Sequence, residues 1–331
     1  MPMTASRIAR TVLTLALLLS ALPGLAAEKL DTLHIDWAYY SPVSLVLKDK
    51  GWMEEEFAKD GVKVDWVLSL GSNKALEFLN GNAVDFGSSA GAAALLAKAN
   101  GIPIKAVYIF DKPEWTALVT LKSSPIQKIE DLKGKRIAVT RGTDPHIFLL
   151  RALALHGLKS EDVRMVLLQH PDGRVALERG DVDAWAGLDP YMAQTELEKG
   201  SRLFFRNADL NTWGFLNTRE DFAAAHPDIV ERVLTVYEKA RQWSLAHPEE
   251  LRAIVAKAGR LSDAVAARDL ERNDLSSGMI GRQQRDTIVA AGDVLKQSGI
   301  IPADTDIART ADALIDPQYI IRVSKRLEAG R

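Results

Sequence analysis

Hydroxyl, amide and carboxyl side chains of this chain gather in short turns that follow apolar runs and precede helical patterns. The clearest examples are "LGSN" at residues 70–73, "GSSAG" at 87–91 and "RGTDPH" at 141–146. Serine, threonine, asparagine and aspartate at such positions cap free N–H groups at the start of a helix. A helix tip made of small residues also offers those N–H groups to an anion. The pattern indicates either simple caps or an anion site built from several helix tips.

One of these turns also permits a different chemistry. "GSSAG" matches the G-x-S-x-G nucleophile elbow of serine hydrolases, in which Ser89 would attack a carbonyl carbon. Histidines follow it in the chain at His146, His170, His226 and His247, among others, so the order of a hydrolase triad is available. The same serines serve an oxyanion as hydroxyl and N–H donors. We favour this binding interpretation and keep an exported serine hydrolase using Ser89 as the alternative.

Composition removes several other classes of function. The 331 residues include no cysteine, which excludes disulfides, thiolate catalysis and a lipid-modified cysteine. The six histidines are dispersed without metal-ligand spacing, and no phosphate-binding loop or complete G-x-G-x-x-G motif is present. The net charge of −2 gives no basic footprint for nucleic acid. We therefore expect no metal, no cofactor, no nucleic-acid partner and no enzymatic activity.

The elements that must position these turns recur as units of strand, turn and helix. Such units occupy residues 33–51, 62–81, 83–101, 135–157 and 181–200, and each ends at a glycine. Alternating strands and helices indicate an α/β fold with largely parallel sheets. Because the turns that follow parallel strands share one sheet edge, the helix tips converge there. The chain after Gly214 is helical, amphipathic and rich in charge.

The N-terminal segment has the three-part pattern of a secretory signal peptide. Arg7 and Arg10 precede the apolar run Val12–Leu22, and the small residues Ala26 and Ala27 follow. The run is too short to span a membrane comfortably. We expect residues 1–27 to be a signal peptide, cleaved after Ala26 or Ala27, and the mature protein to reach the periplasm.

Three stretches carry a resemblance to a known family. They are "LGSNKALEFLNGNAVDFG", "SSPIQKIEDLKGKRIAVTRGTDPHIFLLRAL" and "ALERGDVDAWAGLDPYMAQTELEKG". They resemble the solute-binding proteins of ABC importers for alkanesulfonates, taurine and nitrate, with the aliphatic-sulfonate branch most similar. The resemblance runs from about Leu30 to the C-terminal helices. It implies a type II periplasmic-binding fold, in which two α/β lobes enclose a ligand cleft and two chain segments cross between them.

The resemblance also implies a domain organisation and partners. Lobe 1 would comprise residues 28–121 and 213–331, lobe 2 would comprise residues 122–212, and the crossings would lie near Lys122 and Trp213. The protein would be a monomer that captures an aliphatic sulfonate and delivers it to an ABC permease in the inner membrane. The alternative ligands within this fold are taurine, a sulfate ester, nitrate or a thiamine precursor.

The ligand contacts implied by the resemblance lie on the turns and near the crossings. They are Tyr39, Tyr40, Ser41, Gly71, Ser72, Asn73, Ser88, Ser89, Trp115, Gly142, Thr143, His146, Asp189 and Trp213. The chain departs from the family pattern at Arg141 and Asp144, where relatives often carry small neutral residues. We expect Asp144 to cap its own helix, Arg141 to neutralise it, and the Thr143 hydroxyl to bind an oxyanion.

Overall fold

The computed structural model describes residues 30–330. The expected signal peptide, residues 1–27, lies outside these described residues. No helix in the described part of the chain is both long enough and apolar enough to cross a membrane.

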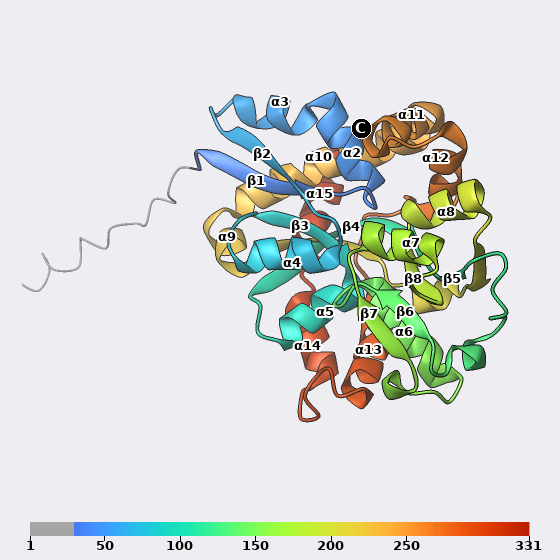
Figure 1. The fold of residues 1–331 in the computed structure, drawn as a ribbon. Coiled ribbons are helices and arrows are strands. Elements are labelled where there is room, and N and C mark those ends of the chain that lie inside the picture. The colour runs from blue at the N-terminus through green and yellow to red at the C-terminus, as the bar shows by residue number, and fades with distance from the viewer. Residues whose placement is uncertain (1–29, 331) are drawn as a thin grey trace, which may run out of the picture. The chain divides into compact units, whose positions relative to one another are not determined.

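The strands form two mixed sheets (Figure 1). The six-stranded sheet has the order β11-β4-β10-β3-β1-β2 and the five-stranded sheet the order β7-β6-β8-β5-β9. The strands of the first are β1 (Thr32–Trp37), β2 (Lys63–Leu68), β3 (Phe86–Ala90), β4 (Ile104–Pro113), β10 (Gly214–Arg219) and β11 (Asn273–Asp274). Those of the second are β5 (Thr116–Thr120), β6 (Arg136–Val139), β7 (Arg164–Leu167), β8 (Ala184–Leu188) and β9 (Arg202–Phe205).

Parallel pairing places the expected helix tips on one edge of each sheet. Strand β1 pairs in parallel with β2 and β3, and β6 pairs in parallel with β7 and β8. Strands β10 and β5 run antiparallel to their neighbours. The helices that follow the parallel strands directly are α2 (Pro42–Lys50), α4 (Ser72–Asn80), α5 (Gly91–Ala99), α6 (Asp144–Leu155), α7 (His170–Arg179) and α8 (Tyr191–Lys199).

The remaining helices pack around these units. They are α3 (Trp52–Ala58), α9 (Glu220–Ala225), α10 (Pro227–Ala246), α11 (Pro248–Gly259), α12 (Asp263–Leu270), α13 (Arg282–Gln297), α14 (Ile307–Leu314) and α15 (Gln318–Ala329). Helices α10 and α11 contact α2, α13 contacts α5, α6 and α14, and α12 contacts α8 (Figure 1). The C-terminal helices therefore cover strand–helix units of both sheets.

Both faces of the five-stranded sheet are buried, as its strand sequences require. Successive side chains of a strand point to opposite faces. Leu118 accordingly belongs to a cluster with Phe148 of α6, whereas its neighbour Val119 belongs to a second cluster with Leu177 of α7. This two-sided burial holds α6 and α7 on opposite faces of the sheet, with their first turns at the same edge.

The chain crosses between the sheets twice. The first crossing is Glu114–Trp115, because β4 ends at Pro113 and β5 already pairs with β8 and β9. The expected position near Lys122 was therefore wrong. The second crossing lies between β9 and β10 and includes Trp213, near which it was expected. A short strand that the sequence did not suggest, β11, extends the edge of β4 next to the first crossing.

A buried carboxyl group joins two strands of the six-stranded sheet. Asp36 of β1 has no exposed surface, and its Oδ1 accepts hydrogen bonds from the backbone N–H and the hydroxyl of Ser88, each at 2.9 Å. Burial raises the pKa of Asp36 from 3.8 to about 7, although the hydrogen bonds from Ser88 oppose this shift. Asp36 is therefore protonated in the folded state at pH values where it is ionised in the unfolded chain.

This raised pKa predicts a pH dependence of stability. The folded state binds the proton of Asp36 more tightly than the unfolded state does. The stabilisation that this group contributes is therefore fully present below about pH 4 and is lost as the pH rises through 7. We expect Asp36→Asn to remove that slope, which is at most about 1.4 kcal/mol per pH unit, from unfolding free energies measured in urea. Asp304→Asn, in an exposed loop, is the control. An Asp36→Asn protein with the wild-type slope would contradict this account.

Candidate functional site

A small enclosed cavity lies where turns from both sheets meet. Its volume is about 10 Å³, which is room for roughly one water molecule. The six-stranded sheet contributes the turn after β1 and the tip of α4, and the five-stranded sheet contributes the tips of α6 and α7. The lining residues are Tyr40, Ser72, Trp115, Thr143, Asp144, Pro145, His170 and Leu188.

Three helices begin at the cavity, so their N-terminal dipoles contribute a positive potential there. Ser72, Asp144 and His170 are the first residues of α4, α6 and α7. The first N–H groups of a helix have no partner within it and carry the positive end of its dipole. Among the described residues, no lysine or arginine lines the cavity. The structure thus brings together helix tips that can receive an anion without a basic side chain.

Two glycines let the facing turns approach closely. Gly142 has a φ of +79°, a conformation that favours glycine, and a Cβ placed on it would lie 3.9 Å from Cβ of Asn73. A Cβ on Gly71 would lie 2.8 Å from Oδ1 of Asn73 and 3.0 Å from Nε2 of His170. A side chain at position 71 would therefore collide with a residue of the opposite sheet. Gly71 permits direct contact between the tips of α4 and α7.

Asp144 does not cap its own helix, which corrects the sequence-based expectation. The N-cap of α6 is Thr143, without a side-chain capping bond, and Asp144 is 1% exposed. Its Oδ2 accepts hydrogen bonds from Nε1 of Trp115 and the backbone N–H of Thr212, both at 2.9 Å. Its Oδ1 accepts a 2.7 Å hydrogen bond from the Thr212 hydroxyl. One carboxylate therefore ties the tip of α6 to both crossings.

The charge of Asp144 is balanced differently from what the sequence suggested. Burial raises its pKa, while the hydrogen bonds from Thr212 and Trp115, and the charge of Arg151, lower it. Arg141, which was expected to neutralise Asp144, is exposed and acts instead on His146. The hydrogen bonds from the crossings stabilise the carboxylate more than any neighbouring cation does.

Several expected hydroxyl donors are already engaged within the protein. The Thr143 hydroxyl, which was expected to bind an oxyanion, donates to the carbonyl oxygen of Thr140 at 2.6 Å in this arrangement. The Ser88 hydroxyl donates to Asp36. The Ser72 Oγ, by contrast, accepts from the backbone N–H of Ala90 at 2.9 Å, which leaves its own O–H free to donate into the cavity.

Ser89 lacks the surroundings of a catalytic nucleophile. It lies inside strand β3, opposite Phe215 of β10, and not on a sharp turn. Its hydroxyl donates to the carbonyl oxygen of Ala90 at 3.2 Å and accepts from the Asn217 amide at 2.9 Å. Neither hydrogen-bond partner is a histidine. The geometry does not support the alternative of a serine hydrolase.

Two expected ligand contacts lie away from the cavity. The Asp189 carboxylate pairs with Arg272 at 3.0 Å and accepts a 2.8 Å hydrogen bond from the backbone N–H of Ala193. Burial raises the pKa of Asp189 to about 6, and the charge of Arg272 opposes the shift. The ring of Trp213 packs under Lys112, whose Nζ lies 5.2 Å from the ring centroid. Both side chains serve contacts within the protein.

Three expected contacts follow β1, and one of them, Tyr40, lines the cavity. The ring of Tyr40 stands edge-on to Trp115, with the centroids 5.9 Å apart, and its hydroxyl donates to the carbonyl oxygen of Ser88. The ring of Tyr39 meets Tyr191 across the two sheets at 6.5 Å. Ser41 is fully buried with an unpaired Oγ.

His146 also lies beside the cavity without lining it. The backbone N–H of Gly142 contacts its Nδ1 at 3.5 Å. Burial and the charge of Arg141 lower the pKa of His146 to about 4, so its ring is neutral near pH 7. His146 therefore supports the glycine turn as an uncharged side chain.

His170 is a cavity residue that the sequence analysis did not assign to the binding site. It begins α7, and neither of its ring nitrogens has a hydrogen-bond partner in the structure. A signal was available, because "LLQHPDG" joins an apolar run to a helix with Pro171 in its first turn, as "TRGTDPH" does with Pro145. This unit was absent from the five repeats recognised in the sequence.

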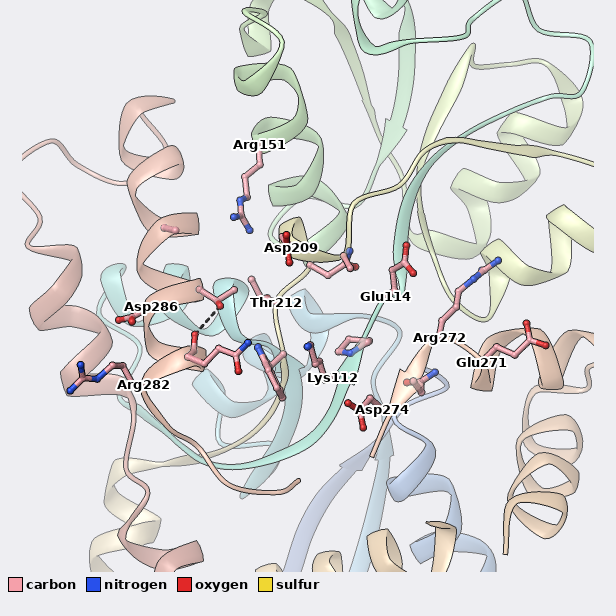
Figure 2. A pocket seen from close by; sticks show the side chains of 18 residues that line it. Lys112, Glu114, Arg151, Asp209, Thr212, Glu271, Arg272, Asp274, Arg282 and Asp286 are labelled. Atoms are coloured by element: carbon pink, nitrogen blue, oxygen red, sulfur yellow. Dashed lines mark hydrogen bonds between the residues drawn. The ribbon is translucent and has the colours of Figure 1, made fainter. Parts of the chain in front are cut away.

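A larger pocket of about 830 Å³ opens on another side of the crossings (Figure 2). Glu114 lines it, whereas the next residue, Trp115, lines the small cavity. Cationic and anionic side chains alternate around it. The charged lining residues are Lys112, Glu114, Arg151, Asp209, Glu271, Arg272, Asp274, Arg282 and Asp286. This mixture gives the larger pocket no preference for an anion.

The contacts of Asp144 predict that removing its charge destabilises the protein. In Asp144→Asn the amide oxygen can still accept from the N–H donors of Trp115 and Thr212, but the N–H₂ group then faces the Thr212 hydroxyl, which loses the oxygen to which it donates. We expect the free energy of unfolding in urea to fall by about 1–3 kcal/mol.

A double-mutant cycle separates this contact from general damage. Thr212→Val and Asp144→Asn should be non-additive by about 0.5 kcal/mol or more, because they remove the same hydrogen bond. Asp209→Asn, an exposed residue of the second crossing, should change stability by less than about 0.5 kcal/mol. Additive effects, or an unchanged stability in Asp144→Asn, would show that the carboxylate does not hold the crossings.

Known proteins are similar to this chain in both sequence and fold. The family described as NMT1/THI5 like matches residues 41–251. A candidate aliphatic sulfonates-binding protein of Bacillus subtilis is 32% identical over 250 residues, which cover 73% of this chain and 75% of that protein. The alkanesulfonate-binding protein SsuA of Xanthomonas axonopodis pv. citri, solved with bound MOPS, superposes with a TM-score of 0.80 at 26% identity. That match covers 88% of this chain and 100% of the other.

A second solved structure agrees. The periplasmic aliphatic sulphonate binding protein SsuA of Escherichia coli superposes with a TM-score of 0.73 at 26% identity, covering 85% of this chain and 97% of that one. These similarities confirm the expected periplasmic-binding fold. The chain belongs to the NMT1/THI5-like family, as a relative of its aliphatic sulfonate-binding proteins.

Proposed function

We propose that this protein is the periplasmic solute-binding component of an ABC importer and that it captures an aliphatic sulfonate. The observation that carries the proposal is the cavity lined by the first residues of α4, α6 and α7, where no lysine or arginine of the described chain takes part in the lining. Helix N-termini offer N–H donors to an anion. A sulfonate presents three acceptor oxygens and no donor, so it needs surroundings of this kind. The relatives named above bind ligands of this class.

The two sheets, with their helices, act as two lobes that close on the ligand. Support comes from the two crossings, which are the chain segments that pass between the sheets, and from the cavity, which takes its lining from both sides. With room for about one water molecule, the described form is closed more tightly than a form that holds the ligand. A sulfonate with an alkyl chain therefore enters when the lobes part. The protein acts as a monomer. The permease in the inner membrane recognises its closed, ligand-filled form.

The carboxylates near the site favour a ligand without an amine. Asp144 is the one carboxylate among the lining residues, and its two oxygens already accept three hydrogen bonds from the crossings. An ammonium group, such as that of taurine, would find no free carboxylate. Trp115 and Leu188 offer apolar surface to an alkyl chain instead. We therefore propose an unsubstituted alkanesulfonate as the ligand.

Calorimetry against a panel of small molecules tests this function. We expect hexanesulfonate to bind and taurine to bind at least about tenfold more weakly, a difference of about 1.4 kcal/mol. Ser72→Ala should weaken hexanesulfonate binding by about tenfold or more, because it removes an O–H donor to a charged oxygen. Ser160→Ala, outside the cavity, is the matched control. Binding of a neutral heterocycle without binding of any sulfonate would refute the proposal.

The closing motion has a separate test. A ligand drives closure only through contacts that differ between the open and closed forms. Small-angle scattering should show a smaller radius of gyration with saturating hexanesulfonate than without it. An identical scattering profile in both conditions would contradict two lobes moving about the crossings.

A further inference from the structure

Buried polar atoms without partners cluster at the contact between α4 and α7. His170 has no exposed surface, and neither Nδ1 nor Nε2 forms a hydrogen bond. Oδ1 of Asn73, on the facing tip, is also buried and unpaired. Leaving such a group without a partner is unfavourable, and most buried polar atoms in proteins are paired. Both groups lie close to Gly71, next to the cavity that His170 lines, and unpaired polar side chains from two lobes at one place indicate a ligand that engages them.

The ring of His170 is uncharged. Burial lowers its pKa to about 3, and its place at the first residue of α7 adds the positive end of a helix dipole, which also disfavours the imidazolium. The one carboxylate that lines the same cavity, Asp144, is held by Trp115 and Thr212. A neutral imidazole has one N–H donor and one acceptor nitrogen.

We infer that His170 is a specificity-determining residue that donates a ring N–H to an oxygen of the sulfonate, and that the side-chain amide of Asn73 donates to the same group from the facing lobe. This inference rests on the proposed function and extends it to a residue of α7. The structural basis is the position of Nε2, which reaches to within 3.0 Å of a Cβ placed on Gly71, beside Asn73. Rotation of the Asn73 amide presents its N–H₂ group to the ligand.

The arrangement explains how a site without cations selects a singly charged oxyanion. Two neutral donors from opposite lobes contact different oxygens of one tetrahedral group, so both bonds form together when the lobes are closed. A carboxylate ligand has two oxygens in one plane and cannot match donors on both sides as well as a sulfonate can. His170 and Asn73 therefore link recognition of the head group to closure.

Calorimetry with hexanesulfonate on two His170 variants tests the inference. His170→Leu removes both ring nitrogens, and we expect affinity to fall about tenfold or more. His170→Gln retains an N–H donor near the position of Nε2, and we expect its affinity to lie closer to wild type than that of His170→Leu. His34→Gln, at a partly exposed position of β1, is the matched control and should bind as wild type does. Unfolding midpoints of all four proteins establish that each is folded.

The outcomes separate the inference from the proposed function. If the wild type binds no sulfonate, both the proposed function and the role of His170 are refuted. If the wild type binds and His170→Leu binds equally well, the function stands and the role of His170 is refuted. Nitrogen-15 NMR of wild-type histidine side chains provides a readout that does not depend on the folding of a variant. Hexanesulfonate should shift the ring nitrogen signals of His170, and unchanged signals in the saturated complex would overturn the inference.

Discussion

A single buried carboxylate sets the geometry of this molecule. Asp144 accepts hydrogen bonds from Trp115 on the first crossing and from Thr212 on the second. Both crossings, and the helix that carries half of the binding site, therefore share one anchor. Because the anchor sits at the first residue of α6, it also fixes the Gly142–Thr143 turn that faces α4. Separate hydrogen bonds to each crossing could not impose the same common position.

The anchor also shapes the electrostatics of the site. An unpaired carboxylate beside the cavity would repel an anion. The two oxygens of Asp144 instead accept three hydrogen bonds from the crossings, which stabilise its negative charge. His146 and His170 are held neutral by burial. The site therefore offers dipoles and N–H groups in place of opposing charges. Such a site suits reversible capture and release, which transport requires, more than chemical transformation of the ligand.

Much of this architecture was predictable from the sequence because it is encoded locally. Units of strand, turn and helix, with glycine or proline at their boundaries, give the parallel strands and the converging helix tips. The glycine of "LGSN" lets the tip of α4 approach His170 of the other sheet closely. The first crossing was misplaced because "TALVTLKSSP" shows where β5 ends, whereas the change of sheet occurs just before it and leaves no turn signal.

The errors at individual side chains share one physical cause. Aspartate at a helix tip predicts a cap, yet Asp144 finds its partners 29 and 68 positions away, on segments that no local pattern connects to it. Asp189 likewise pairs with Arg272, which lies 83 positions further along the chain. The unit "LLQHPDG" marked His170 as the start of a helix, but its burial and its lack of hydrogen-bond partners arise only in the fold.

A crystal structure of the protein with hexanesulfonate would test the central claim most directly. The account predicts the sulfonate group between the tips of α4, α6 and α7, with the Asp144 carboxylate still bonded to Trp115 and Thr212. Electron density for the ligand in the larger pocket, beside Lys112 and Arg282, would contradict it.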